Sequence, residues 1–173
     1  MQKSSNASGW SLPFGGLGAG RERKRLPGVD RILVPVRGAP IDQDALLLSS
    51  EIARQSKAML YVVYIIEVPR TLPLHASPDS EMDAAETVLS QMESTCERQH
   101  VKVETELLQA RQTGPAVVAE ATERGADLIV MGMSYKRRYG DFTLGDAIPY
   151  ILEYAMCPVW VLREPMSREG SEK

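Results

Sequence analysis

Residues 126–163 decide the fold class of this chain, and they read ADLIVMG (126–132), MSYKRRYGDFT (133–143), LGDAIPYILEYA (144–155) and, after Met156, CPVWVLR (157–163). Two short apolar runs enclose a polar, basic loop and a segment with helical spacing. This pattern predicts a buried strand, a loop, a helix and a second buried strand. In α/β folds, a strand that leads through a glycine-bearing loop into a helix is a common phosphate site. The stretch therefore predicts an α/β fold and a candidate anion site.

The same alternation extends back to residue 31. Apolar runs at 32–36 and 58–66 predict buried strands, and the alternating stretch 101–108 predicts a half-exposed edge strand. Asp42 is predicted to cap a first helix, and Thr113, Gly114 and Pro115 to open a third helix that Gly125 closes. A second helix is predicted over 80–99. The predicted apolar faces of the first two helices consist of Ala45, Leu48, Ser49, Ile52 and Ala53, and of Ala84, Ala85, Val88, Leu89, Met92 and Cys96.

Five strands alternating with four helices predict one doubly wound, five-stranded parallel sheet with helices on both faces. An edge position for the third strand favours the order 3-2-1-4-5. This order reverses between the first and fourth strands, and ligands of such sheets bind outside the carboxyl ends of the strands at the reversal. We therefore expect the loop after Val36 to face the loop after Met131.

Composition excludes several classes of protein. The chain has 173 residues, 43% of them hydrophobic and 25% charged, which predicts one globular domain, over residues 30–164. Residues 1–29, with a basic linker at 21–25, and residues 165–173 are predicted to be disordered tails. The net charge of −3 gives no attraction to nucleic acid. No apolar run reaches the ~20 residues of a membrane span, so a cytoplasmic protein that is not membrane-embedded is expected.

Catalytic and metal chemistry find no support in the sequence. Neither a nucleophile elbow nor a histidine beside a nucleophile occurs, Ser134 has no obvious base, and Cys157 is expected to be a packed, inert thiol. The two histidines lack a second ligand at metal spacing. The chain is therefore predicted to be non-enzymatic and free of metal.

Four blocks in order, RILVPV (31–36), GADLIVMG (125–132), LG (144–145) and CPVWVL (157–162), resemble the universal stress protein family over about residues 29–163. The resemblance implies an α/β fold of the adenine nucleotide alpha hydrolase-like kind, and roles in stress response and regulation. It also implies frequent homodimers through the last strand, here Pro158 to Leu162. One branch of the family binds ATP or another adenine nucleotide, and some relatives work beside membrane transporters.

The nucleotide-binding branch carries the pattern Gly, two residues, Gly, nine residues, Gly, then Ser or Thr. Aligned here, its glycines fall on Gly132, Tyr135 and Gly145, its hydroxyl residue falls on Asp146, and its nucleoside-contacting Asp falls on Arg37. The resemblance thus implies a degenerate nucleotide site, whose candidate residues are Pro35, Arg37, Gly38, Ile65, Gly132, Lys136, Arg137, Gly145, Asp146 and Ala147.

The departures from the pattern predict weak or absent ATP binding. Asp146 is expected to cap the last helix with its own carboxylate and so repel a phosphate. The ring of Tyr135 is expected to fill the pocket, and Arg37 to pair with Asp146 across the gap. Two alternatives stay open. In one, Arg37 and the basic loop from Lys136 compensate, so that ATP binds. In the other, the chain is an accessory domain of a membrane transporter, contacted through residues 21–25.

Overall fold

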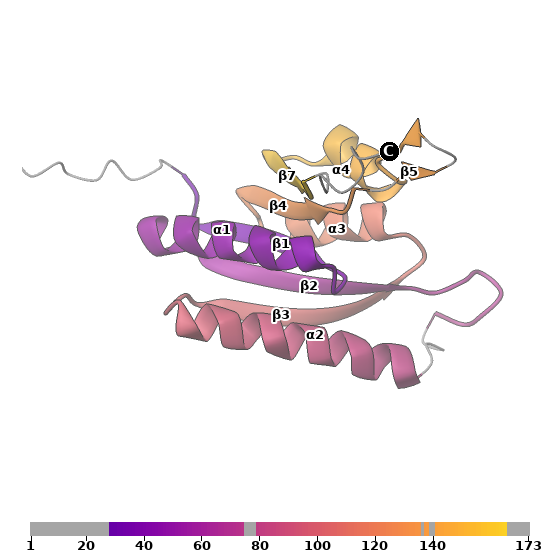
Figure 1. Cartoon of the computed structure of the whole chain (residues 1–173), viewed down its shortest axis with the longest axis horizontal. Helices are drawn as coiled ribbons and strands as arrows, with labels where there is room; N and C mark the ends of the chain where they lie inside the picture. The colour runs from indigo at the N-terminus through magenta and orange to yellow at the C-terminus, as the bar shows by residue number, and fades with distance from the viewer. Residues whose placement is uncertain (1–27, 75–78, 136, 139–140, 166–173) are drawn as a thin grey trace, which may run out of the picture.

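A five-stranded parallel sheet in the order β3-β2-β1-β4-β7 forms the centre of the molecule (Figure 1). The computed structural model describes residues 28–74, 79–135, 137–138 and 141–165. The strands are β1 (Arg31–Val36), β2 (Met59–Glu67), β3 (Val103–Ala110), β4 (Leu128–Met133) and β7 (Val159–Arg163). Because β1 pairs with both β2 and β4, the order reverses beside β1. The predicted sheet and its order are confirmed.

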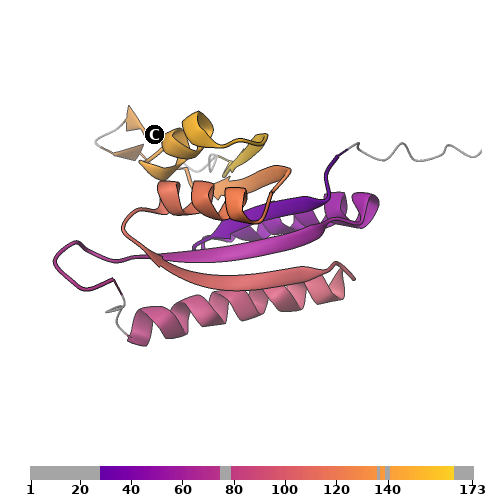
Figure 2. The same cartoon turned by 180° about the vertical axis from the view of Figure 1, so that it is seen from behind.

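Helices cover both faces of the sheet, as Figures 1 and 2 show from opposite sides. The helices are α1 (Pro40–Ser56), α2 (Asp79–Arg98), α3 (Thr113–Glu123) and α4 (Ala147–Tyr154). Side chains alternate between the faces along β1, so that Ile32 and Val34 pack in one core cluster with α1 and α2. Leu33 packs in the other cluster, with α3 and α4. Each central strand is thus apolar on both sides, which explains its continuous apolar sequence.

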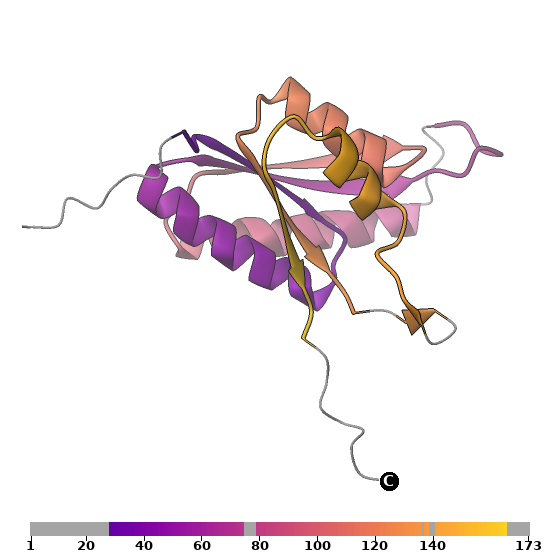
Figure 3. The same cartoon turned by 90° about the horizontal axis from the view of Figure 1, so that it is seen from above.

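The loop after β4 contains a small hairpin that was not predicted. Strands β5 (Arg137–Arg138) and β6 (Asp141–Phe142) pair antiparallel, and Figure 3 shows them projecting beyond the end of the main sheet. Strands of two residues are too short for a period of alternation to appear in the sequence.

Three details of the predicted helices are wrong. Helix α1 begins at Pro40, a position that proline favours, so that Asp42 lies inside its first turn and does not precede the helix. Leu48, predicted to face the core, is 37% exposed, whereas Leu46, two residues before it, is fully buried. In α2, Ala84 is exposed beside the buried Ala85. Because each helix carries apolar residues at several nearby positions, the sequence pattern does not show which of them packs inward.

A cluster of charges lies between the end of α3 and strand β3. Arg124, directly after α3, pairs with Glu120, Glu106 and Glu104, and its guanidinium carbon lies 4.5 Å from the centre of the Tyr61 ring. Hydrogen bonding to Glu120, and then to Glu106, raises the pKa of Arg124 above its usual value. The cluster thus covers apolar sheet surface with charged side chains.

Some predictions concern residues outside the described ranges. Both tails, including the basic linker 21–25, belong to these apart from Gly28, Val29 and Pro165, so their predicted disorder stays a prediction. Within the part of the chain that the structure describes, no helix combines the length and apolarity that crossing a membrane requires.

Candidate functional site

Two adjoining cavities lie where the sheet order reverses, at the carboxyl ends of β1 and β4. The inner cavity has a volume of about 200 Å³ and the outer cavity about 630 Å³. They join into one groove, because six residues line both: Pro35, Val36, Arg37, Thr113, Asp146 and Ala147. The predicted meeting of two loops is also present, since Arg37, after β1, donates from Nη2 to Oγ of Ser134, after β4, at 3.3 Å.

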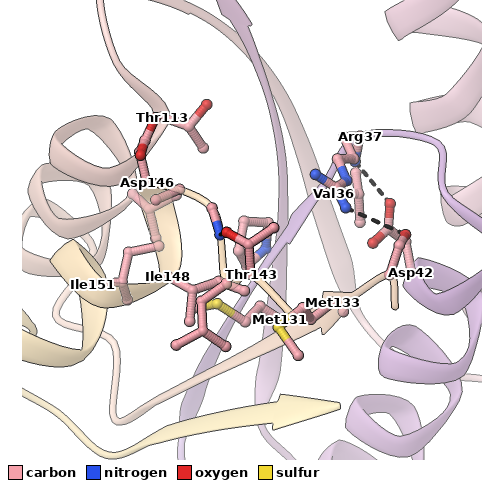
Figure 4. Close-up of a pocket in the computed structure, with 17 residues that line it drawn as sticks. Val36, Arg37, Asp42, Thr113, Met131, Met133, Thr143, Asp146, Ile148 and Ile151 are labelled. Carbon is pink, nitrogen blue, oxygen red and sulfur yellow. Dashed lines mark hydrogen bonds between the residues drawn. The ribbon is translucent and has the colours of Figure 1, made fainter. Parts of the chain in front are cut away.

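The inner cavity has mainly apolar walls. Met131 and Met133 come from β4, Ile148 and Ile151 from α4, and Val117 from α3. Figure 4 shows the side chains of Met131, Ile148 and Ile151 gathered on one side of the cavity, with Arg37 and Asp42 on the other. This slot suits the apolar body of a small ligand.

A carboxylate of the chain itself accepts hydrogen bonds from backbone N–H groups of the β1–α1 loop. Oδ2 of Asp42 accepts the N–H groups of Arg37 and Ala39, each at 2.9 Å. Figure 4 shows the bond from Arg37. The side chain is only 2% exposed. This burial raises the pKa of Asp42, while the hydrogen bonds from Arg37 and Ala39 act in the opposite direction. The loop donors that could hold an external anion therefore already hold an internal one.

The start of α3 is occupied in the same way. Oε1 of Glu67, at the end of β2, accepts the N–H of Thr113 at 2.6 Å. A carboxylate is favourable at the positive end of a helix. Two of the helices that begin at the groove, α1 and α3, thus have an internal anion at their first turn.

The predicted cap of α4 by Asp146 is wrong. Asp146 has a helical backbone conformation, at φ −92° and ψ −32°, and its side chain makes no hydrogen bond to the helix. The turn before it is formed by Gly145, whose φ of +70° is left-handed and whose N–H donates to Oγ1 of Thr143. A cap residue needs an extended backbone to return its oxygen to the first N–H groups, and the helical Asp146 cannot do so.

The predicted Arg37–Asp146 pair is also not formed. Arg37 donates to Ser134, and no ion pair joins it to Asp146 within the described residues. In Figure 4, Asp146 lies across the cavity from Arg37, on the side of Thr113. The backbone of Arg37 is held by Asp42, on the α1 side of the groove.

Tyr135 does not fill the cavity as predicted. Its backbone N–H donates to Oε2 of Glu164 at 3.3 Å, and the guanidinium of Arg163 lies 5.2 Å from the centre of its ring. The residue is absent from the lining of both cavities. The end of β7 therefore supplies the contacts that hold Tyr135 outside the groove.

Gly132 has a packing role that the motif did not suggest. A Cβ at this position would lie 2.8 Å from Oδ1 of Asp42 and 2.9 Å from Cγ2 of Ile41. The first turn of α1 packs against β4 only because residue 132 has no side chain. This close approach brings Asp42 to the groove.

The structure brings most of the predicted site residues together. Pro35, Arg37, Gly132, Gly145, Asp146 and Ala147 line the inner cavity, and Ile65 lines the outer one. Gly38 lines neither cavity, and a Cβ added at this position would lie 3.0 Å from Cγ2 of Val88. Lys136 lies outside the described residues, and Arg137 is described only as backbone.

The sequence analysis did not place three polar residues, Asp42, Glu67 and Thr113, in the lining of the groove. Their position offers a signal, because each follows a predicted strand closely or begins a helix at the carboxyl edge of the sheet. Together with Glu81 and Asp146, they give the described lining four carboxylates, namely Asp42, Glu67, Glu81 and Asp146, against one cation, Arg37. No cluster suited to a metal ion occurs among the residues described.

Comparison with known proteins agrees with this geometry. Residues 28–163 match the universal stress protein family. Universal stress protein MJ0531 of Methanocaldococcus jannaschii is 27% identical over 141 residues, covering 78% of this chain and 82% of the relative. Universal stress protein Rv2624c of Mycobacterium tuberculosis is 30% identical over 153 residues. This alignment covers 84% of this chain and 53% of that relative.

Solved structures share the fold. The universal stress protein of Archaeoglobus fulgidus in complex with dAMP superposes with a TM-score of 0.62 at 22% identity, covering 76% of this chain and 95% of that one. Other solved members of the family are complexes with cAMP or AMP. Because the family match extends over nearly all of the described residues, this chain belongs to the universal stress protein family.

Proposed function

We propose that the chain is a non-enzymatic regulatory domain of the stress response, whose groove binds ATP weakly or not at all. The observation that carries this proposal is the charge of the groove. Its described lining has four carboxylates and a single cation, Arg37. A triphosphate entering such a groove meets a net repulsive field.

Two further features act against phosphate binding. The backbone donors at the start of α1 and α3 already bind the carboxylates of Asp42 and Glu67. Asp146 precedes α4 at the place where the nucleotide-binding pattern has a hydroxyl group. Asp146 is exposed, so water and salt screen its charge, and we expect it to weaken ATP binding by about tenfold.

Binding of ATP is the main alternative function. It is supported by the family members solved with adenine nucleotides and by the basic residues of the loop 136–138. Regulation of a membrane transporter through residues 21–25 is a further hypothesis, and it rests on the resemblance alone.

Calorimetric titration separates weak from strong ATP binding. We expect the wild-type chain to bind ATP with a dissociation constant weaker than about 10 μM at physiological salt, and Asp146→Ser to bind about tenfold more tightly. Asp44→Ser is the matched control, because Asp44 is an exposed carboxylate of α1 outside the groove, and its removal should change nothing. Tighter wild-type binding that is weakened by Arg37→Ala would instead establish the alternative.

We also propose a homodimer through the last strand. Among the residues that the structure describes, β7 pairs with β4 alone, so its other edge has no described strand beside it, and Trp160 on this strand is 44% exposed. Pairing of two copies over Pro158 to Leu162 would cover both features. Sedimentation should show a dimer that Trp160→Glu dissociates and that Leu152→Glu, at an exposed site on α4, leaves intact. A wild-type monomer at about 100 μM would refute the dimer.

A further inference from the structure

The charge of the groove also indicates which ligands it accepts. We propose that the groove selects uncharged or cationic small molecules with an apolar body. Among compounds with the same base and sugar, adenosine then binds more tightly than AMP, and AMP more tightly than ATP. This inference deepens the proposed function and rests on it, because it gives the ligand class of the same groove.

Apolar side chains form most of the wall of the inner cavity. Its volume of about 200 Å³ is lined in part by the side chains of Met131, Val117, Ile148 and Ile151. Ile148 and Ile151 are 9% and 2% exposed, and Met131 is 3% exposed, so these walls are parts of the packed core. A rigid apolar slot of this kind favours a flat ring over a hydrated, charged group.

Carboxylates line other parts of the groove. Glu67 accepts the N–H of Thr113, and Asp42 accepts two N–H groups, and these hydrogen bonds favour positions of both carboxylates at the groove. Asp146 and Ala147 lie where the two cavities join, and Glu81 lines the outer cavity. A ligand with its ring in the inner slot therefore extends past carboxylates.

The one described cation of the lining does not offset these charges. Arg37 is exposed and already donates to Ser134. Three of the four carboxylates, Glu67, Glu81 and Asp146, are exposed as well, so solvent screens each interaction. Under such screening, we expect each added phosphate to weaken binding by about threefold, and each positive charge to strengthen it by a similar factor.

The experiment is a titration series with one scaffold and graded charge: 5′-amino-5′-deoxyadenosine, adenosine, AMP and ATP, followed by NMR in buffer without divalent cations. Affinity should fall in that order, by about threefold for each added phosphate, and the differences should shrink when salt rises from ~50 to ~500 mM. Glu81→Gln should strengthen ATP binding about threefold without changing adenosine binding. Glu86→Gln, an exposed carboxylate of α2 outside the groove, should change neither.

The outcomes separate this inference from the proposed function. ATP binding as tight as adenosine binding overturns the inference, and it overturns the proposed function too if the dissociation constant is tighter than about 10 μM. No adenosine binding at about 5 mM overturns the inference and leaves weak ATP binding intact. Equal effects of Glu81→Gln and Glu86→Gln would show a general charge effect, and this also contradicts a selective groove.

Discussion

Replacement of Gly132 by alanine tests whether this motif glycine serves packing in this chain. The added Cβ would lie 2.8 Å from Oδ1 of Asp42, 2.9 Å from Cγ2 of Ile41 and 3.1 Å from the backbone carbon of Ile41. Contacts this short do not persist, so α1 must move away from β4. Ile41 and Asp42 are 4% and 2% exposed, and the hydrogen bonds that Asp42 accepts from Arg37 and Ala39 oppose a rotation of its side chain.

The expected cost follows from these contacts. Overpacking of a filled core costs about 1–3 kcal/mol, and weakening of the hydrogen bonds that Asp42 accepts adds about 1 kcal/mol. We therefore expect Gly132→Ala to lower the free energy of unfolding by about 2–4 kcal/mol. Urea denaturation followed by circular dichroism measures this difference, provided that the slope of the transition is unchanged.

A double-mutant cycle identifies the cause. Ile41→Ala removes Cγ2, so the loss from Gly132→Ala should be about 1 kcal/mol smaller in that background. Ile52→Ala is the matched control, because Ile52 is a buried residue of α1 that is not among the nearest contacts of the added Cβ, and its effect should be additive. A loss below about 0.5 kcal/mol for Gly132→Ala, or additivity with Ile41→Ala, would refute the steric explanation.

Three further predictions concern stability. Burial raises the pKa of Asp42 above its ordinary value of 3.8, so that between 3.8 and the raised value the folded chain binds more protons than the unfolded chain. The free energy of unfolding, compared with that of Asp42→Asn, should therefore fall as pH rises through this window. Urea unfolding between pH 3.5 and 7 checks the sign, and a difference that grows with pH would contradict it. Arg124→Met should lower the free energy of unfolding by about 1–2 kcal/mol at low salt and by less at ~1 M salt. Arg54→Met, which removes an exposed pair, should lower it by less than about 0.5 kcal/mol. Equal losses for the two variants would show that burial of the cluster is unimportant. Gly145→Ala should lower the free energy of unfolding by about 1–2 kcal/mol, because φ is +70°; no atom lies near the added Cβ, so a clash does not contribute. Gly145→Asn should lower it by less, and thermal melting should rank the two variants in that order.

Hydrophobic patterning was enough to predict the framework. The apolar runs that became β1, β2 and β4 are buried on both faces because the helices cover both, and the half-exposed β3 lies at the edge as its alternation indicated. The left-handed turn at Gly125, with φ +60°, ends α3 as predicted. These features depend on the period and on local backbone preferences, which are present in any window of the sequence.

The partners of polar groups could not be predicted in this way. Asp42 was expected to precede and cap α1, but it lies in the first turn, where it accepts the N–H groups of Arg37 and of the N-cap residue Ala39. Arg37 contacts Ser134 and not Asp146, and Tyr135 contacts the end of β7. Burial of apolar surface has no direction, so a pattern of residue types is sufficient to predict it. A hydrogen bond requires two atoms within about 3 Å and in line, and only the packed chain determines which groups meet at that distance.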